Sequence, residues 1–288
     1  MFFATLVAAI WGGNYVSAKF AMAHFPPFFL TSLRFACVGA LLLPFVPRPE
    51  PEQIRRIAAL ALVLGVLHFA LLFSSMYIGL SIASLSIVAD LGVPFSCLLG
   101  ALLHNDRLGK WRILGMVVAF VGIIIVSGTP NIVQHPLAFC VGLAGSFFWG
   151  LSNIMIKDIK GVKNFQMLAW MAVFAVPQLW IISAVLERHQ WQLLAATPPF
   201  VMAAVAYTVL GSTLTAYGLW YHLLQQYKVT QVAPFSLLTP VFGIAFGRLF
   251  FPEPLTWQVV IGGAITIFGV AVILMRRPGL VGKISEAA

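Results

Sequence analysis

Residues 11–19, WGGNYVSAK, and residues 149–157, WGLSNIMIK, are two versions of one pattern that begins with Trp-Gly and ends with lysine. Downstream, Leu-Gly-Val-Pro at 91–94 matches Leu-Leu-Thr-Pro at 237–240. The pair Gly115 and Gly122 likewise matches Gly262 and Gly269. A repeat that extends along most of a chain indicates a duplicated structural unit. We therefore divide the chain into two repeats, residues 1–130 and 131–277.

The composition excludes an ordinary soluble domain, because 61% of the residues are hydrophobic, 9% are charged and the mean hydropathy is +0.98. A membrane-spanning helix needs about 20 mostly apolar residues. Ten segments meet this requirement: residues 2–22, 28–47, 57–79, 83–104, 111–128, 135–156, 165–186, 199–222, 229–251 and 257–275. The links are short, so residues 1–288 form a single transmembrane domain that ends in a tail at 278–288. We interpret residues 1–23 as the first span and not as a signal peptide, since they lack a basic start.

Basic residues are concentrated in alternate links between the predicted spans. Thirteen of the 17 fall on one side: Arg48, Arg55, Arg56, Arg107, Lys110, Arg112, Lys157, Lys160, Lys163, Lys228, Arg276, Arg277 and Lys283. By the positive-inside rule this side is cytoplasmic. We therefore expect a multi-pass protein of the inner (plasma) membrane with both termini and the tail in the cytoplasm. Topology also accounts for the net charge of +9, so we expect no nucleic-acid partner.

Each repeat contains five predicted spans, and this odd number has a geometric consequence. The second repeat must start from the opposite membrane face, which makes the two repeats inverted with respect to each other. Such repeats are typical of secondary transporters, in which two equivalent packings open a central site to either side in turn. Duplication for stability alone, in a channel or a membrane enzyme, is the competing interpretation. The predicted fold class is thus an all-α membrane protein of ten transmembrane helices in two inverted five-helix repeats.

Several motifs also resemble a known family. They are the Trp-Gly…Lys pattern, Leu33-Arg34-Phe35, Pro94 and Pro240, and the corners Asp106-Arg107-Leu108 and Glu253-Pro254-Leu255. Over its whole length the chain resembles the drug/metabolite transporter superfamily, and within it the ten-helix EamA-type branch. It is similar to bacterial amino-acid exporters, including those that expel aromatic amino acids. The resemblance implies a transporter that exports small organic solutes. Asp106 stands where glutamate is more common in the family.

Polar and aromatic side chains within the spans are candidates for a solute cavity, because lipid offers polar groups no partner. The predicted cavity residues are Trp11, Asn14, Tyr15, Tyr77, Trp149, Asn153 and Tyr217. Such a cavity would suit a flat aromatic solute through stacking and cation–π contacts. Hydrogen bonds between helices are an equal alternative for the asparagines. An interfacial belt is the alternative for Tyr77 and for the cluster of Tyr217, Trp220, Tyr221 and His222. We interpret Lys19 and Lys157 as anchors at helix ends.

Three ionisable residues lie inside predicted spans. Asp90 and Arg34 sit at similar depth, so they form either a structural ion pair or, through Asp90, a proton-coupling site. His68 is either a hydrogen-bonded packing residue or a second proton carrier. Two prolines, Pro94 and Pro240, occupy equivalent positions in the repeats and predict helix kinks, which serve either as gates and ligand contacts or only in helix packing.

Other function classes lack their sequence signals. There is no G-x-x-x-x-G-K-[ST] loop, and Cys37, Cys97 and Cys140 fit neither metal nor disulfide spacing. We therefore expect no cofactor, no metal and no enzyme, with a small-molecule substrate and the bilayer as partners and a monomer as the simplest state. The prediction is a secondary, non-ATP exporter of amino acids, aromatic ones among them, or related metabolites, which works by alternating access. Export of amphipathic drugs or toxic cations and a membrane-embedded enzyme are the alternatives. Facilitated diffusion and proton antiport both stay open.

Overall fold

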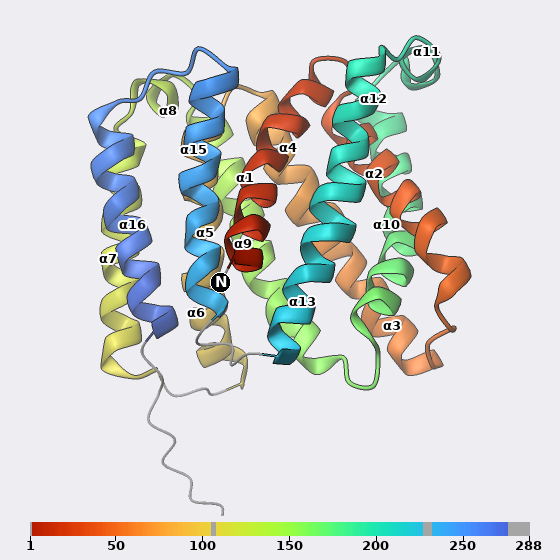
Figure 1. Cartoon of the computed structure of the whole chain (residues 1–288), viewed down its shortest axis with the longest axis horizontal. Helices are drawn as coiled ribbons and strands as arrows, with labels where there is room; N and C mark the ends of the chain where they lie inside the picture. Colours follow the sequence, from red (N-terminus) through yellow and green to blue (C-terminus); the bar gives the residue numbers. More distant parts are fainter. Residues whose placement is uncertain (1, 105–107, 227–231, 276–288) are drawn as a thin grey trace, which may run out of the picture.

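A computed structural model describes residues 2–104, 108–226 and 232–275, and every regular element within them is a helix (Figure 1). The first repeat contains α1 (Phe2–Met22), α2 (Pro27–Leu42), η1 (Leu43–Phe45), α3 (Pro51–Leu60), η2 (Ala61–His68), α4 (Phe69–Tyr77), α5 (Ile82–Asp90), α6 (Gly92–His104) and α7 (Lys110–Ser127). The second contains α9 (Pro136–Asp158), α10 (Asn164–Leu186), α11 (Gln190–Ala195), α12 (Pro199–Ala206), η3 (Tyr207–Thr215), α13 (Ala216–Gln226), η4 (Ala233–Leu237), α15 (Leu238–Phe250) and α16 (Trp257–Met275), and the short α8 (Pro130–Gln134) links the two. Some predictions lie outside the described residues: those on Asp106, Arg107, Lys228, Arg276, Arg277, Lys283 and the tail, and that on the side chain of Tyr221.

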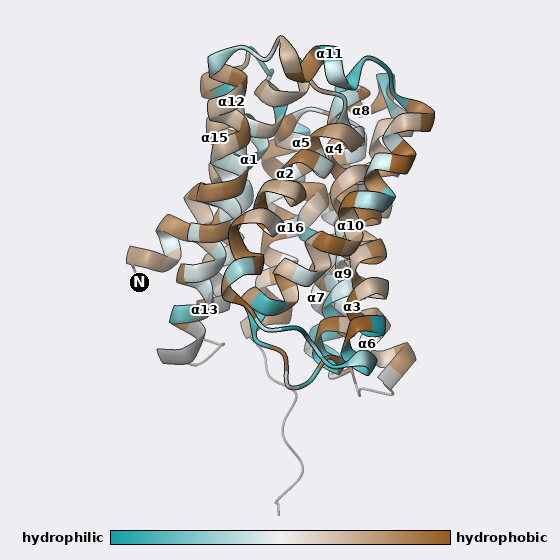
Figure 2. Cartoon of the chain, turned by 90° about the vertical axis from the view of Figure 1, so that its right-hand side faces the viewer, coloured by the Kyte–Doolittle hydropathy of each residue, from teal (hydrophilic) through white to brown (hydrophobic). Residues whose placement is uncertain are grey.

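Eight helices or continuous helix runs within the described residues are long and apolar enough to cross a membrane. They cover residues 27–45, 51–77, 82–103, 110–127, 136–158, 164–186, 199–220 and 257–275. A shorter apolar helix covers residues 235–250. At 21 residues α1 has the length of a span, but it carries the polar Asn14 and Lys19. Hydrophilic residues gather at the two ends of the bundle, whereas hydrophobic ones dominate its middle (Figure 2).

The repeated glycines are contact points between α7 and α16, which lie side by side at one edge of the bundle (Figure 1). A Cβ atom on Gly122 would lie 2.6 Å from the carbonyl oxygen of Gly262, and one on Gly115 would lie 2.7 Å from that of Gly269. Gly115 and Gly262 are equivalent in the repeat, as are Gly122 and Gly269, so exchanging the repeats converts one contact into the other. The order of the contacts also means that these two equivalent helices run antiparallel. Small residues allow this close approach.

The third predicted span of each repeat is widened in its middle. The segment η2 joins α3 to α4, and its counterpart η3 joins α12 to α13; both are π-helical. A π-helix leaves backbone carbonyls differently spaced from those of an α-helix and occurs frequently at functional sites. The two repeats therefore carry the same irregularity at equivalent places.

The fourth predicted span of each repeat is broken where the prolines stand. Helix α5 ends at Asp90 and α6 begins at Gly92, while η4 ends at Leu237 and α15 begins at Leu238. Pro94 and Pro240 are thus each the third residue of a new helix. Proline is tolerated in a first helical turn, where its missing N–H has no intrahelical acceptor. The prolines therefore stand in the first turn after an interruption of each span, where the sequence predicts a kink.

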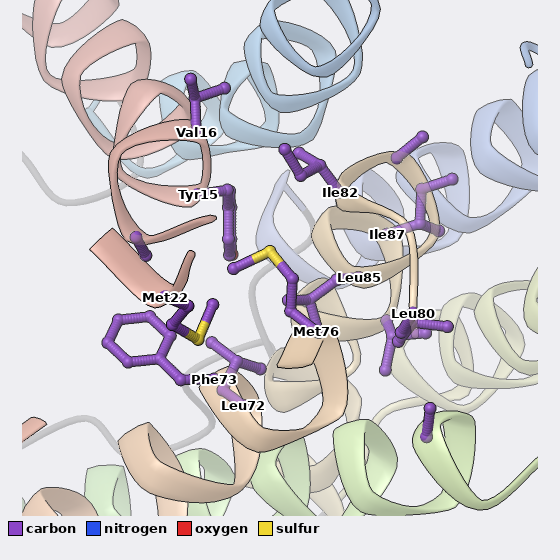
Figure 3. Close-up of a cluster of buried hydrophobic side chains, with 14 of the residues drawn as sticks. Tyr15, Val16, Met22, Leu72, Phe73, Met76, Leu80, Ile82, Leu85 and Ile87 are labelled. Atoms are coloured by element: carbon purple, nitrogen blue, oxygen red, sulfur yellow. The ribbon is translucent and has the colours of Figure 1, made fainter. Parts of the chain in front are cut away.

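The largest buried cluster closes one end of the bundle. Figure 3 shows Met22, Phe73, Met76 and Leu85 packed together below Tyr15. These side chains come from the C-terminal ends of α1 and α4 and from α5, so they lie where α1 and α4 end and α5 begins. We call this the Glu253 end of the bundle, because Glu253 binds the start of α5 there. The opposite end, with Arg56, Asp158 and Lys160, is the basic end.

Candidate functional site

Several predicted site residues meet in the interior, where α1, α2 and α13 pass the widened and broken helices. Hydrogen bonds, ring contacts and electrostatic interactions connect all of them except Asn14, which is buried on α1 next to Tyr15. We call this group the central cluster, and it consists of Trp11, Asn14, Tyr15, Arg34, His68, Asp90, Thr213, Tyr217 and Trp220.

Arg34 joins the two repeats at the heart of the central cluster. Its side chain is 2% exposed, and its Nε and Nη2 atoms donate hydrogen bonds of 3.1 and 2.8 Å to the hydroxyl of Thr213 in η3. The Thr213 hydroxyl in turn donates to the carbonyl of Thr208, five residues back, as π-helical geometry allows. The guanidinium also lies over the ring of Phe69, 4.6 Å from its centroid. A buried arginine is thereby fixed in place by one hydroxyl and one aromatic face.

Three aromatic rings form one wall of the central cluster. The ring of Trp11 lies 5.4 Å from that of Tyr217 and 5.3 Å from that of Trp220, in tilted and edge-on arrangements. Tyr217 and Trp220 are three residues apart on α13, so both point toward α1. Tyr207 completes the contact by donating a hydrogen bond of 3.0 Å to the carbonyl of Ile10. Trp220, expected in an interfacial belt, is therefore part of the wall.

Four polar atoms of the central cluster are buried without a hydrogen-bond partner in the protein. They are Trp11 Nε1, Asn14 Oδ1, Arg34 Nη1 and Asp90 Oδ2. Leaving such an atom unpaired costs about 1–3 kcal/mol, and buried polar groups normally have a partner. Two donors and two acceptors of the central cluster are therefore left without a partner in the protein, and a polar solute or water molecules would satisfy them.

Several ionisable residues of the central cluster interact electrostatically with one another. Tyr15 interacts with Asp90 and with Tyr217, and Arg34 interacts with Tyr217 and with His68. Asp90 is also the last residue of α5, and Pro94 cannot donate a hydrogen bond to its carbonyl oxygen. The C-terminal end of a helix carries partial negative charge. The break thus presents a carboxyl group and a free carbonyl to the interior, which favours a cationic group.

Arg34 and Asp90 do not form the predicted ion pair. Lys19–Glu253 and Arg56–Glu52 are ion pairs of the described residues, and neither includes Arg34 or Asp90. The guanidinium of Arg34 donates its hydrogen bonds to Thr213 instead. The sequence contains no signal for this partner beyond the presence of several threonines in the eighth predicted span. His68 donates from Nδ1 to the carbonyl of Gly145 at 2.9 Å, which matches the packing alternative for this histidine.

The remaining predicted residues lie elsewhere. The ring of Trp149 packs against Gly92, and Asn153 donates a hydrogen bond of 3.1 Å to the hydroxyl of Ser96. Both therefore hold α9 against α6, outside the central cluster. Tyr77 is 55% exposed at the Glu253 end, where it lines a cavity of about 600 Å³ with Met22 and Glu187 among its other walls.

Metal chemistry has no evident site in this arrangement. Within the residues that the structure describes, no group of three or more His, Cys, Asp or Glu side chains is placed to hold a metal ion. The central cluster instead combines aromatic rings, one guanidinium and one carboxyl group.

Comparison with known proteins agrees with the duplicated, helical architecture. The model of the EamA-like transporter family matches the chain twice, over residues 1–128 and 136–275. A probable amino-acid metabolite efflux pump of Salmonella typhimurium is 29% identical over 276 residues, which cover 93% of this chain and 92% of that protein. A protein of the same description from Escherichia coli is 28% identical over 274 residues, 92% and 91% of the two chains. A solved structure that is 18% identical has a TM-score of 0.62 and covers 94% of both chains, which shows a common fold.

Proposed function

The chain belongs to the EamA-like transporter family, and from this premise we propose that it exports small organic solutes by alternating access without hydrolysing ATP. The observation that carries the proposal is the central cluster, in which four unpartnered polar atoms adjoin an aromatic wall. This cluster lies where the helices of a duplicated transporter are widened and broken, as midplane solute sites are in transporters with inverted repeats. A membrane-embedded enzyme is disfavoured by the family assignment.

The proposed topology has ten spans in two inverted five-helix repeats, with both termini on the cytoplasmic side of the inner membrane. The antiparallel contact between the equivalent helices α7 and α16 supports inversion. The excess of lysine and arginine at the basic end supports a cytoplasmic position for that end. Nothing in this arrangement requires a second subunit, so a monomer is the proposed transport unit.

The proposed solutes are amino acids, with aromatic ones foremost, or related metabolites. Trp11, Tyr217 and Trp220 supply rings on which an aromatic side chain can stack. Arg34 Nη1 offers a donor to a carboxylate, and Asp90 Oδ2 offers an acceptor to an ammonium group. The names of the two efflux pumps that the chain resembles support the same class.

Organic cations are the second candidate class. Asp90 ends a helix with its carboxyl oxygen unpaired, and aromatic faces nearby attract a cation. This alternative predicts that a quaternary ammonium compound without a carboxylate is transported as well as an amino acid is.

The test is flux from proteoliposomes that contain the purified protein. Radiolabelled aromatic, aliphatic and basic amino acids and a quaternary ammonium compound are loaded in turn, with and without a pH gradient. Aromatic amino acids are expected to leave fastest, and empty liposomes give the background. No flux of any amino acid above background would refute the substrate proposal. A flux that is the same with and without the pH gradient would identify facilitated diffusion. A flux that depends on the pH gradient in the parent protein but not in Asp90→Asn would identify Asp90 as the proton carrier.

A further inference from the structure

Lys19 and Glu253 form an ion pair between the two repeats at the Glu253 end. The Nζ atom of Lys19 lies 2.6 Å from Oε1 of Glu253, and the side chains are 29% and 10% exposed. The same ammonium group lies 4.5 Å from the ring centroid of Phe251. The pair is therefore partly withdrawn from water and has a fixed geometry, unlike the Arg56–Glu52 pair, whose side chains are 50% and 77% exposed.

Glu253 also holds the start of α5. Its two carboxylate oxygens accept hydrogen bonds from the backbone N–H groups of Ile82, at 3.0 Å, and Ala83, at 3.3 Å. A carboxylate at a helix N-terminus is stabilised by the unpaired N–H groups and by the helix dipole. One side chain of the second repeat thus clamps two helices of the first, α1 and α5.

Helix α5 connects this clamp to the central cluster. It is nine residues long, with the bonded N–H groups in its first turn and Asp90 as its last residue. On α1, Lys19 follows Tyr15 by four residues, so the two side chains share a face. A displacement of Lys19 or Glu253 is therefore transmitted to the central cluster through two short helical segments, α5 and the turn of α1 between Tyr15 and Lys19.

A cavity lies directly outside the clamp. It has a volume of about 480 Å³, and its walls include Lys19, Ser84, Asn131, Glu253 and Thr256. The hydroxyl of Thr256 is buried without a partner. We call this cavity the vestibule.

The interior is sealed on the vestibule side. Tyr15, Met76 and Ile82 are all less than 10% exposed and belong to one buried apolar cluster (Figure 3). Trp11, Tyr217 and Trp220, one to two turns nearer the basic end, are only partly buried. The structure is thus closed at the Glu253 end and less tightly packed toward the basic end.

We infer that the Lys19–Glu253 pair is the gate between the central cluster and the vestibule, and that a solute bearing a carboxylate leaves by taking the place of Glu253 at Lys19. The inference rests on the proposed function for its direction of transport. Displacement of Glu253 would at once free α1 and uncap α5, so that one event opens the path and moves the helix that ends at Asp90. The vestibule then serves as the exit subsite, with Lys19 as its contact for anions.

The gate can be tested without knowledge of the solute. In a variant whose three native cysteines are replaced by alanine, Asn14→Cys reports the accessibility of the central cluster to a membrane-impermeant thiol reagent added outside intact cells. Glu253→Gln and Lys19→Met are each expected to raise the labelling rate about tenfold, the order of shift that loss of a partly buried ion pair produces in a two-state equilibrium. The double variant is expected to label no faster than the faster single variant, because both changes break the same pair.

Two controls separate a gate from general loosening. Glu52→Gln removes the exposed Arg56–Glu52 pair at the basic end and should leave labelling of Asn14→Cys unchanged. Gln134→Cys lies at an exposed position in the vestibule wall and should label equally in all backgrounds. Unchanged labelling of Asn14→Cys in both Lys19→Met and Glu253→Gln, or equal acceleration by Glu52→Gln, would overturn the inference.

Lys19→Met labelled alone tests the gate where Glu253→Gln does not reach the membrane, and a second readout holds the gate closed. Lys19→Cys and Glu253→Cys are combined and joined by a short bifunctional thiol reagent, with the uncross-linked variant as reference. Cross-linking should abolish solute flux, and flux that survives it would remove the gate. Labelling needs no solute, so the two proposals can fail separately. If labelling responds to the substitutions while no amino acid is transported, the gate inference holds and the substrate proposal fails. If amino acids are transported while labelling does not respond, only the gate inference fails.

Discussion

The hydroxyl of Thr213 accepts two hydrogen bonds from the guanidinium of Arg34, although the residues belong to different repeats and lie 179 positions apart. This contact fixes the one buried arginine of the central cluster and uses a π-helical segment to do so. It also leaves Nη1 of Arg34 unpaired. The two repeats are thus joined at the place where we propose that the solute binds.

Thr213→Val removes this acceptor while keeping the shape of the side chain. We expect the free energy of unfolding in mixed micelles to fall by about 1.5–3 kcal/mol, because a buried charged donor loses its partner. Thr31→Val is the matched control, since the equally buried hydroxyl of Thr31 bonds only the carbonyl of Pro27 in its own helix. It should cost less than about 1 kcal/mol. Equal losses of unfolding free energy in the two variants would show that the contact with Arg34 contributes no more to stability than a hydrogen bond within one helix.

Gly122→Ala tests the contact between the repeats at α7 and α16. The added Cβ atom would lie 2.5 Å from the backbone nitrogen of Thr266 and 2.6 Å from the Gly262 oxygen, so the helices must separate. We expect a loss of about 1–3 kcal/mol in the same unfolding assay. Gly218→Ala, whose Cβ meets only the ring of Phe165 at 3.5 Å, should be neutral or stabilising. An unchanged midpoint for Gly122→Ala would contradict the packing described here.

The architecture follows from local patterns to a large extent. The lengths of the apolar segments and the repeated glycines are readable in the sequence because span length and small-residue contacts depend on few neighbours. The π-helical segment Ala61–His68 is not readable, since it is a plain apolar run whose extra residue per turn is selected by the packing of helices distant in sequence. The prolines reveal the position of the helix breaks but not their form.

The central cluster is only partly predictable. Trp11, Tyr15 and Arg34 are recognisable as polar or amphipathic groups inside spans, where they need partners. Thr213 is not, because threonine is common in membrane helices and its partner is remote. The repeat itself misleads at Trp149, because the residue that its ring faces is Gly92, whose lack of a side chain lets the ring pack against α6. Equivalent residues in a duplicated chain therefore need not share a role.

Substitutions of the two asparagines of the repeated pattern should have different effects, one on transport and the other on stability. Asn14 has an unpaired Oδ1 in the central cluster, whereas Asn153 donates to Ser96 between α9 and α6. Asn14→Ala is expected to raise the KM for transport about tenfold with little change in stability, as loss of one solute hydrogen bond does. Asn153→Ala should instead lower stability by about 1 kcal/mol and leave the KM unchanged. The reverse pattern would place the solute in the second repeat.

The proposed orientation is open to a direct labelling test. Lys160→Cys lies in an exposed link at the basic end, and Arg188→Cys in an exposed link at the other end. In intact cells a membrane-impermeant thiol reagent should label residue 188 and spare residue 160 until the cells are opened. Labelling of residue 160 from outside intact cells would contradict the proposed topology and indicate the opposite orientation.

The most direct test of the central cluster as the solute site compares Trp11→Ala with Trp149→Ala, equivalent substitutions in the two repeats. Each variant is reconstituted at equal protein content, and efflux of the best amino-acid solute is measured. Because Trp11 contacts the rings of Tyr217 and Trp220 while Trp149 packs on Gly92, Trp11→Ala should lower kcat/KM about tenfold, the upper end of what the loss of an aromatic contact of about 0.5–1.5 kcal/mol implies. Trp149→Ala should change it by less than about threefold. Equal effects of the two substitutions, or no effect of Trp11→Ala, would contradict the account.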